Sequence, residues 1–504
     1  MTTIASDLTS PIPHPSRGLF ASLLFAGMSL SCAGELWAEQ HTAGVPELSS
    51  RPGADYTIYL NVAGFTFTGA WGGSSNNPGT TLAVNDRLPT DTFTTDEQTQ
   101  IKAIWSRVAQ SYVGFNVNVT TVDPAIAALG AGATDAQRQV FYDATPNMMH
   151  TIVGSQNRAA LVGLPDSDPG TTDMNPSGKW YSTGADGVSG LGIVAGVTGN
   201  ATDHTNWMFT EAQAGAATGG VINGDYIGAV SAHENAHAFG LYHQGDWNGA
   251  TKVNEYSLGD TTGGDGSYVP IIGQAAGKQR VTWRVGDTGG PTDTRTPIND
   301  IQSMLSINNV SNGRTGTANL HLVNDGIGHT LATATPLPVI GDLVNFSLAT
   351  GVIVPNSESN PLAIGAGNYA QDWFSFTLAS SAMITLTANN GTQFLTAGVA
   401  DGVGTLRSTL SIYDGNGLSI GTAIEDSSTL FETFMGNLTA GTYYAKVGSF
   451  GGHEQIAPAF NSAQYFDRGA YFLTGSGFAA VVPEPGTMIL LGAGSILLFR
   501  RRRA

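Results

Sequence analysis

Five residues near the middle of the chain have the types and spacing of a metal centre with a neighbouring base. They form the pattern His233-Glu234-x-x-His237-x-x-Gly240-x-x-His243. On a helix, residues four apart lie on one face, so His233 and His237 can reach one cation. Gly240 lacks a Cβ and allows the backbone to stop the helix and turn. The turn returns His243 as a third nitrogen ligand.

This set of side chains predicts zinc chemistry. Three nitrogen ligands with one open position describe a catalytic zinc site, whereas structural sites are closed by four protein ligands. We therefore predict that His233, His237 and His243 bind Zn²⁺ and that Glu234 is a general base for water that the cation activates. The alternative is ordinary histidines on an amphipathic helix, and the length of the motif argues against it. We interpret the other seven histidines as structural or solvent-exposed: His14, His41, His150, His204, His321, His329 and His453.

The run HENAHAFGLYH resembles the extended zinc signature of the metzincin metallopeptidases, and the surrounding chain is most similar to bacterial reprolysin-like members. The resemblance implies hydrolysis of peptide bonds. Such enzymes carry a methionine beneath the metal, but Ile272 stands in the matching segment Val269–Gly273. Reprolysins place Asp directly after the third histidine, whereas this chain has Gln244 there and its first acid at Asp246. Gln274 lies two residues after Ile272, where no tyrosine is present, so the oxyanion would rely mainly on zinc.

A helix must carry the first two histidines. We predict that it runs from Asp225, as N-cap, to Phe239. Ala229, Ala232 and Ala236 form a second stripe with Phe239, away from the histidines, and small side chains there indicate close packing against a sheet.

The segments before this helix alternate between strand and helix patterns. Thr94 and Glu97 form a capping box. The helix after it has an apolar stripe of Ile101, Ile104, Trp105, Val108 and Tyr112. Strands are predicted at Tyr56–Val62, Phe115–Thr120, Met148–Val153, Leu191–Val197 and Asn206–Thr210. This order indicates a mixed α/β domain. The resemblance adds that it matches a metzincin upper subdomain, and Leu191–Val197 is our candidate edge strand for an extended substrate.

The chain changes character after the motif. Residues 245–300 are predicted to be mostly loop, with Asn299-Asp300 matching an acid-rich stretch of the family. Short strands with Gly and Asn turns then predict an antiparallel β-sandwich: Asp372–Leu378, Leu410–Gly417 and Gly441–Val447. These segments resemble bacterial pre-peptidase C-terminal domains. Asp414 and Asn416 could bind Ca²⁺, although such a run is more often a hairpin turn.

Both ends carry sorting signals. Residues 1–38 read as a signal peptide, with Arg17, an apolar run from Leu19 to Leu30 and a cleavage site after Ala33. Residues 482–504 closely resemble the PEP-CTERM sorting signal, which exosortase processes. The apolar span of this tail, 13 residues, is shorter than the roughly 20 of a stable membrane helix and favours transient membrane insertion. An ordinary C-terminal anchor is the alternative.

Composition narrows the possible partners. The formal net charge of −18 argues against nucleic acid and anionic membrane surfaces. Cys32 is the only cysteine, so no intramolecular disulfide can form. Export and sorting would bring the protein to the cell surface or the extracellular space of a Gram-negative-type bacterium.

The sequence therefore predicts a multidomain protein with an α/β (α+β) metzincin-like catalytic domain followed by an antiparallel β-sandwich. The predicted boundaries are 1–38 for the signal peptide, 39–320 for the catalytic domain, 325–478 for the sandwich and 482–504 for the sorting tail. The predicted function is a secreted or surface-sorted zinc endopeptidase acting on protein or peptide substrates. The alternative is a catalytically weak or inert adhesion protein associated with surface exopolysaccharide.

Overall fold

The computed structural model describes most of the chain between residues 44 and 478. The described residues are 44–71, 78–84, 92–154, 190–198, 204–210, 222–259, 268–275, 278, 280–289, 294–306, 320–354, 371–424, 430–450 and 468–478. The predicted signal peptide, 1–38, and the predicted sorting tail, 482–504, lie outside them.

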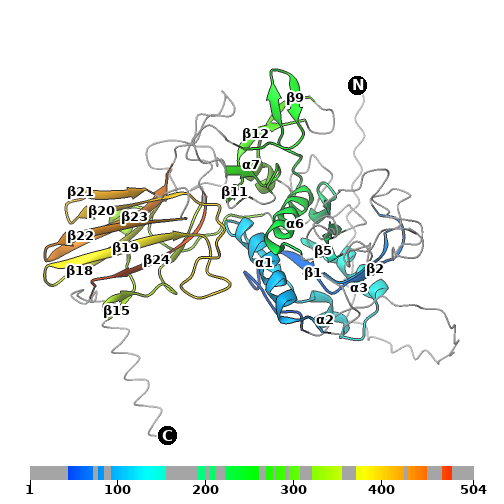
Figure 1. The fold of residues 1–504 in the computed structure, drawn as a ribbon, viewed down its shortest axis with the longest axis horizontal. Coiled ribbons are helices and arrows are strands. Elements are labelled where there is room, and N and C mark those ends of the chain that lie inside the picture. Colours follow the sequence, from blue (N-terminus) through cyan, green and yellow to red (C-terminus); the bar gives the residue numbers. More distant parts are fainter. Residues whose placement is uncertain are drawn as a thin grey trace, which may run out of the picture. The chain divides into compact units, whose positions relative to one another are not determined.

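The first region is built on a five-stranded sheet with the order β4-β1-β5-β7-β6. Figure 1 labels two of its strands, β1 and β5. Its strands are β1 (Tyr56–Asn61), β4 (Val117–Thr120), β5 (Met148–Gly154), β6 (Gly190–Leu191) and β7 (Thr205–Phe209). The first four strands in this order run parallel, and β6 pairs with β7 in the antiparallel direction. The mixed α/β class predicted from the sequence is confirmed.

Four helices of the described chain surround this sheet: α1 (Thr95–Ser111), α2 (Pro124–Leu129), α3 (Asp135–Ala144) and α6 (Gly224–Ala238). The predicted capping box starts α1, because the Thr94 side chain accepts from the Glu97 N–H and the Glu97 side chain accepts from the Thr94 N–H. The predicted apolar stripe of α1 is buried: Ile101, Ile104, Trp105, Val108 and Tyr112.

Alternating side chains along the strands fill two separate cores, because successive residues of a strand point to opposite faces. Ile58 packs in the core that α1 and α6 cover. Its neighbour Tyr59 packs in the core that includes Ala125 of α2 and Tyr142 of α3. The sheet therefore lies between two helical layers, and the helix that carries the histidine motif covers one of its faces.

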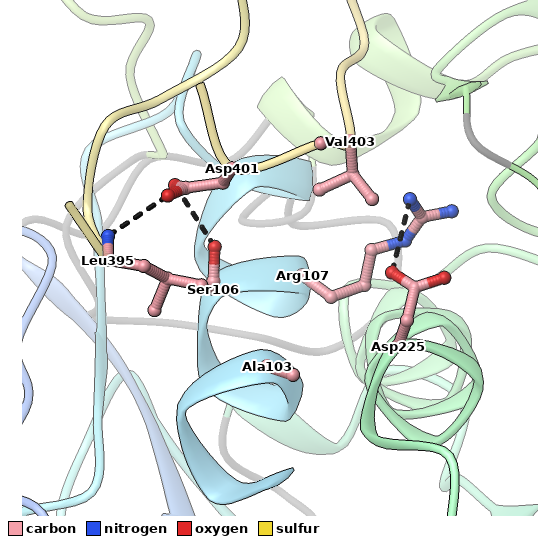
Figure 2. A pocket seen from close by; sticks show the side chains of 8 residues that line it. Ala103, Ser106, Arg107, Asp225, Leu395, Asp401 and Val403 are labelled. Atoms are coloured by element: carbon pink, nitrogen blue, oxygen red, sulfur yellow. Dashed lines mark hydrogen bonds and ion pairs between the residues drawn. The ribbon is translucent and has the colours of Figure 1, made fainter. Parts of the chain in front are cut away.

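The N-cap of α6 differs from the prediction. Asn223 is the N-cap, with its side chain accepting from the Tyr226 N–H, whereas Asp225 lies inside the first turn. Asp225 instead lies 3.7 Å from the guanidinium of Arg107 on α1 (Figure 2). The two helices pack closely here, because a Cβ added at Gly228 would lie 2.6 Å from the Cβ of Arg107.

The segment predicted to be mostly loop contains more regular structure than expected. It has two antiparallel hairpins and a parallel strand pair, and a short helix begins at its last residue. The hairpins are β8 (Asp246–Asn248) with β9 (Thr251–Asn254) and β12 (Val285–Thr288) with β13 (Thr296–Asn299). The parallel pair is β10 (Tyr268–Pro270) with β11 (Arg280–Thr282), and the helix is α7 (Asp300–Leu305). A further hairpin, β2 (Phe65–Phe67) with β3 (Gly79–Thr81), follows β1.

The second region is a β-sandwich of two mainly antiparallel sheets, with the orders β14-β18-β23-β20-β21 and β15-β16-β24-β19-β22 and with β17 paired to β24. Its long strands are β18 (Gln371–Leu378), β19 (Ala382–Asn390), β20 (Ser408–Asp414), β21 (Ser419–Ile424), β22 (Phe431–Leu438), β23 (Gly441–Ser449) and β24 (Gly469–Ser476). The short ones are β14 (Thr335–Pro336), β15 (Val339–Ile340), β16 (Leu343–Val344) and β17 (Thr350–Ile353). The predicted antiparallel β-sandwich is confirmed.

Candidate metal centre

The end of α6 explains how the third histidine returns to the first two. Gly240 has a φ of 91°, a conformation that favours glycine, directly after the helix. Its N–H donates to the carbonyl of His237, and the Leu241 N–H donates to that of Ala236. The chain then turns, so that His243 faces the last turns of the helix.

The structure brings the three predicted ligands together. The ring centroids of His233, His237 and His243 lie 4.8 to 5.1 Å apart. One potential ligand atom from each lies within 4.8 Å of the others, and this is the sole His, Cys, Asp or Glu group of this kind among the described residues. His233 and His237 are buried, and the side chain of His243 is about a quarter exposed.

In each of the three rings, Nδ1 lies within hydrogen-bond distance of a different oxygen atom. Nδ1 of His233 lies 2.9 Å from the carbonyl of Ile271, and Nδ1 of His237 lies 2.8 Å from that of Leu241. Nδ1 of His243 lies 2.7 Å from Oε1 of Glu255. Oxygen atoms of these kinds only accept, so Nδ1 carries the proton wherever one of these rings is neutral. Each Nε2 therefore presents a lone pair.

The geometry of the inner nitrogens suits a cation. Nε2 of His237 and Nε2 of His243 lie 3.1 Å apart. Two lone pairs at this separation repel each other unless a positive charge lies between them. Two nitrogens bound to zinc at about 2.0–2.1 Å in tetrahedral geometry are roughly 3.4 Å apart. These three histidines, called the triad below, could therefore hold a metal ion.

The surroundings keep His233 and His237 neutral, which is the form that binds a metal. Burial, and then the charges of His237 and His243, hold the pKa of His233 well below its usual range. Burial together with His243 lowers the pKa of His237 to about 4.

Glu234, which follows His233 on α6, is held in a tight, buried position. A Cβ added at Gly190 would lie 2.6 Å from Cγ of Glu234, and one at Gly192 would lie 2.4 Å from its carbonyl oxygen. Burial raises the pKa of Glu234 to about 8, and a hydrogen bond from the backbone of Gly192 opposes this shift. The glycines let β6 and the residue after it pass directly over the carboxylate.

The predicted edge strand is shorter than expected. Only its first residue, Leu191, is in β6, and the chain then leaves the sheet towards a 3₁₀ turn at Gly196–Thr198. Asn206 on β7 holds this departure in place, because its side chain accepts from the Ile193 N–H and donates to the carbonyl of Glu234. The prediction of a strand over Leu191–Val197 is therefore wrong beyond Leu191.

The segment matched to the methionine turn lies against the triad. Ile271 supplies the carbonyl that faces His233, and the carbonyl of Ile272 accepts from the Gln244 N–H at 3.0 Å. Ile272 is fully buried in the apolar core. An isoleucine therefore fits at this position. The effect of Ile272 on activity stays a prediction.

Gln244, which stands where reprolysins have Asp, forms a buried network. Its amide donates to Oδ1 of Asp300 at 2.7 Å, and its oxygen accepts from Nε of Arg284 at 2.9 Å. Burial raises the pKa of Asp300 to about 7. A carboxylate at position 244 would remove the donor that Asp300 receives and add a second acid beside it. The amide therefore suits this site, and it links His243 to the start of α7.

Two residues of the site were missed from the sequence. Glu255 faces Nδ1 of His243, and Tyr256 places its ring 4.5 Å from that of His243 and 5.9 Å from that of His233. Burial, followed by the charges of Glu234 and Glu255, raises the pKa of Tyr256. Neither residue belongs to a spacing pattern, because both reach the triad through the β8–β9 hairpin.

The Asp414 segment forms the hairpin turn that was the alternative to a calcium site. Oδ1 of Asp414 accepts from the N–H groups of Asn416 and Leu418, at 2.9 and 2.8 Å. The turn joins β20 to β21.

Comparison with known families identifies the C-terminal signal. Residues 481–503 match the model of the PEP-CTERM protein-sorting motif. The motif indicates an exported protein that is sorted to the cell surface, and it implies processing by exosortase. No helix among the described residues is long and apolar enough to cross a membrane, and the predicted span of the tail lies outside them. A comparison with curated proteins gives no significant match.

Several solved structures are similar to part of the chain. One is the pre-peptidase C-terminal domain of a collagenase from Bacillus anthracis, with 14% identity, 25% of this chain and 85% of that chain covered, and a TM-score of 0.15. Another is CBM35 from Cellvibrio japonicus Abf62, with 13% identity, 25% and 84% covered, and a TM-score of 0.14. A family 35 carbohydrate binding module from an environmental isolate has 18% identity, 23% and 71% covered, and a TM-score of 0.14.

Proposed function

We propose that this chain is a surface-sorted, zinc-dependent endopeptidase. The observation that carries the proposal is the convergence of three imidazoles, together with the buried carboxyl group of Glu234 directly after His233 in the chain. A metal-binding site without a catalytic role would not need this carboxyl group. The sequence resemblance to metzincins supports the choice of peptide bonds as substrate.

The three histidines would hold the ion through Nε2 and leave one position open. Zinc bound there supplies a Lewis acid that polarises a peptide carbonyl and lowers the pKa of water. Three neutral nitrogen ligands suit zinc, whereas magnesium and calcium prefer oxygen ligands.

Glu234 would act as the general base. Its carboxyl group has a pKa of about 8 as a result of burial. A divalent cation nearby favours the charged carboxylate, so binding of the ion would bring this pKa towards or below neutrality. A base whose pKa lies near the working pH can accept a proton from water and then give it to the leaving amine.

The edge of the sheet would orient the substrate. β6 is the last strand in the order of the first sheet, and Gly190 in it and Gly192 after it pack against Glu234. An extended peptide can pair backbone to backbone with such an edge. Pairing along β6 would direct a scissile bond towards the carboxylate and the triad.

The role of Glu234 can be separated from metal binding. We expect Glu234→Ala to retain zinc, because the ligands stay, and to lose roughly 10²–10⁴-fold in casein hydrolysis. Zinc content and hydrolysis would be measured on the same preparation, with Glu47→Ala, an exposed glutamate near the start of the described chain, as control. If Glu234→Ala cleaves casein at the parent rate, the assignment of the base is wrong. If the parent holds zinc but cleaves no protein substrate, the inert surface protein becomes the better interpretation.

A further inference from the structure

The third histidine is held differently from the other two. His233 and His237 lie on α6, and a backbone carbonyl accepts from each Nδ1. His243 lies beyond the helix, and its Nδ1 faces a side chain, the carboxylate of Glu255, at 2.7 Å. A backbone acceptor is present whatever the residue type, so Glu255 is the one acceptor of the three that a substitution can remove.

The β8–β9 hairpin brings Glu255 to this position. The hairpin leaves the site after His243 and returns twelve residues later. Its base is closed by Asp246, whose Oδ2 accepts from the Asn254 amide at 2.9 Å and from the Leu258 N–H at 3.2 Å. Gly245 lets the two ends approach, since a Cβ there would lie 2.6 Å from the carbonyl oxygen of Asn254.

Further contacts fix both the carboxylate and the ring. Nζ of Lys252 lies 2.5 Å from Oε2 of Glu255, so the two oxygens of the carboxylate have separate partners. The ring of Tyr256 packs against His243 with centroids 4.5 Å apart. Lys252 also lies over the ring of Trp247 on the opposite strand of the hairpin, 5.9 Å from its centroid.

We propose that Glu255 is a positioning residue of the metal centre, which holds His243 with its proton on Nδ1 and its Nε2 lone pair towards the cation, and that Lys252 fixes the Glu255 carboxylate. The proposal rests on the metal site of the proposed function. It adds an anionic partner outside the signature motif, on a hairpin that the motif does not predict.

The physical argument concerns the freedom of His243. This side chain is 26% exposed and lies outside the helix, so packing restrains it less than the buried His233 and His237. A neutral imidazole can carry its proton on either nitrogen, and only one form presents Nε2 to a metal. A carboxylate at Nδ1 selects that form and makes Nε2 a stronger electron-pair donor to a metal ion.

Zinc affinity tests the proposal directly. Competition with a chromophoric chelator would be measured for the full chain and for Glu255→Ala, Glu255→Gln and Lys252→Met. We expect Glu255→Ala to bind zinc about 10–100-fold more weakly. The amide in Glu255→Gln still accepts a hydrogen bond but carries no charge, so its loss should be smaller. Lys252→Met should have the smallest effect, and the control Glu47→Ala should bind like the parent.

A second measurement distinguishes positioning from general loss of structure. The visible spectrum of the cobalt-substituted protein reports the ligand set, and we expect it to change in Glu255→Ala. Thermal unfolding of the metal-free variant should match the parent, because the Glu255 side chain lies at the surface. If Glu255→Ala binds zinc within twofold of the parent and gives the same cobalt spectrum, the proposal is overturned.

The outcomes separate this proposal from the proposed function. If the parent binds zinc and Glu255→Ala binds it weakly, but neither hydrolyses protein, the endopeptidase assignment fails and the role of Glu255 stands. If Glu255→Ala hydrolyses protein and binds zinc like the parent, the assignment stands and the role of Glu255 fails. A parent chain that takes up no zinc overturns both.

Discussion

The α/β region and the β-sandwich both place a histidine close to a carboxyl group and a tyrosine, but they shift the pKa of a histidine in opposite directions. His237 is buried, whereas the His329 side chain is half exposed. In the α/β region, burial and His243 lower the pKa of His237 to about 4. In the sandwich, a hydrogen bond to Asp372 raises the pKa of His329 to about 9, although partial burial opposes it.

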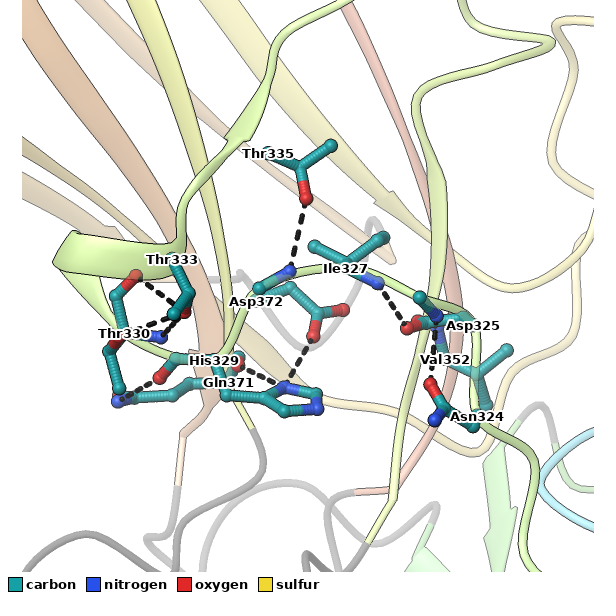
Figure 3. Close-up of polar contacts among 12 residues, drawn as sticks. Asn324, Asp325, Ile327, His329, Thr330, Thr333, Thr335, Val352, Gln371 and Asp372 are labelled. Atoms are coloured by element: carbon teal, nitrogen blue, oxygen red, sulfur yellow. Dashed lines mark hydrogen bonds and ion pairs between the residues drawn. The ribbon is translucent and has the colours of Figure 1, made fainter.

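The difference lies in the partners. In the sandwich, the Tyr471 hydroxyl donates to Oδ2 of Asp372 at 2.7 Å, and Nδ1 of His329 lies 3.5 Å from Oδ1 of the same carboxylate. Gln371 closes the arrangement by donating to the carbonyl of His329 (Figure 3). Asp372 thus has a partner for each oxygen, and the cluster is complete within the protein.

The triad of His233, His237 and His243 differs from this cluster. With the proton of each ring on Nδ1, the three imidazoles direct their Nε2 lone pairs at one another, and the group could hold a metal ion. Buried polar groups cost free energy unless they are paired. The comparison teaches that histidine content alone does not identify a ligand site. A cation site is indicated where several histidines direct their Nε2 atoms at one another, and not where a histidine is paired with a carboxylate of the protein.

The largest expected effect tests the difference between the triad and the His329–Asp372 cluster. We expect His237→Ala to lose zinc affinity by roughly 10³-fold or more, because it removes one of three protein ligands. His329→Ala should leave zinc affinity unchanged, because His329 pairs with Asp372 in the sandwich and is not one of the three predicted ligands. Both would be measured by chelator competition. Equal zinc binding by the parent and His237→Ala would remove the distinction between the two regions.

The next largest effect, on stability and hydrolysis, is expected at Gly190, which packs closely against Glu234. Gly190→Ala would place a methyl group 2.6 Å from Cγ of Glu234, and the side chain must move to make room. We expect a loss of stability of about 1–3 kcal/mol and a larger fractional loss of hydrolysis, because the displaced group is the proposed base. Gly132→Ala is a matched control, with no atom within 4 Å of its added Cβ. Unfolding and hydrolysis would be compared, and a variant that keeps full hydrolysis would contradict the tight placement.

The smallest expected effect is a pH dependence in the sandwich. The pKa of His329 is about 9 in the folded state, above its ordinary value of 6.5, so the proton on His329 stabilises the fold. This contribution is complete below about pH 6.5 and is lost as the pH rises through about 9. It should be under about 1 kcal/mol, because the side chain is half exposed.

Urea unfolding of the parent and of His329→Gln across this pH range would measure the contribution. Asp372, whose pKa burial raises to about 6, is charged throughout most of the window, so it remains a partner for the protonated ring. The stability of the parent should fall towards that of the variant as the pH rises. A constant difference between the two proteins would mean that the ion pair does not contribute.

Much of the fold followed from local patterns. The capping box at Thr94 and the apolar stripe of α1 depend on residues within a few turns, and both occur as predicted. The sandwich strands alternate buried and exposed residues, a pattern that the sequence displays directly. Two local predictions were wrong: Asn223 rather than Asp225 caps α6, and β6 ends at Leu191. In the second case the Asn206 side chain, on the neighbouring strand β7, accepts from the Ile193 N–H in place of a backbone carbonyl.

By itself, the sequence determined that two histidines share one helical face and that a glycine turn carries a third one back, because helix periodicity and glycine geometry act over a few residues. Only the tertiary structure decided that Glu255 and Tyr256 lie against His243 and that Gln244 joins Asp300 in a buried network. These contacts join segments whose separation along the chain has no fixed relation to their distance in space. They depend on the packing of hairpins and helices, which no spacing of residue types encodes.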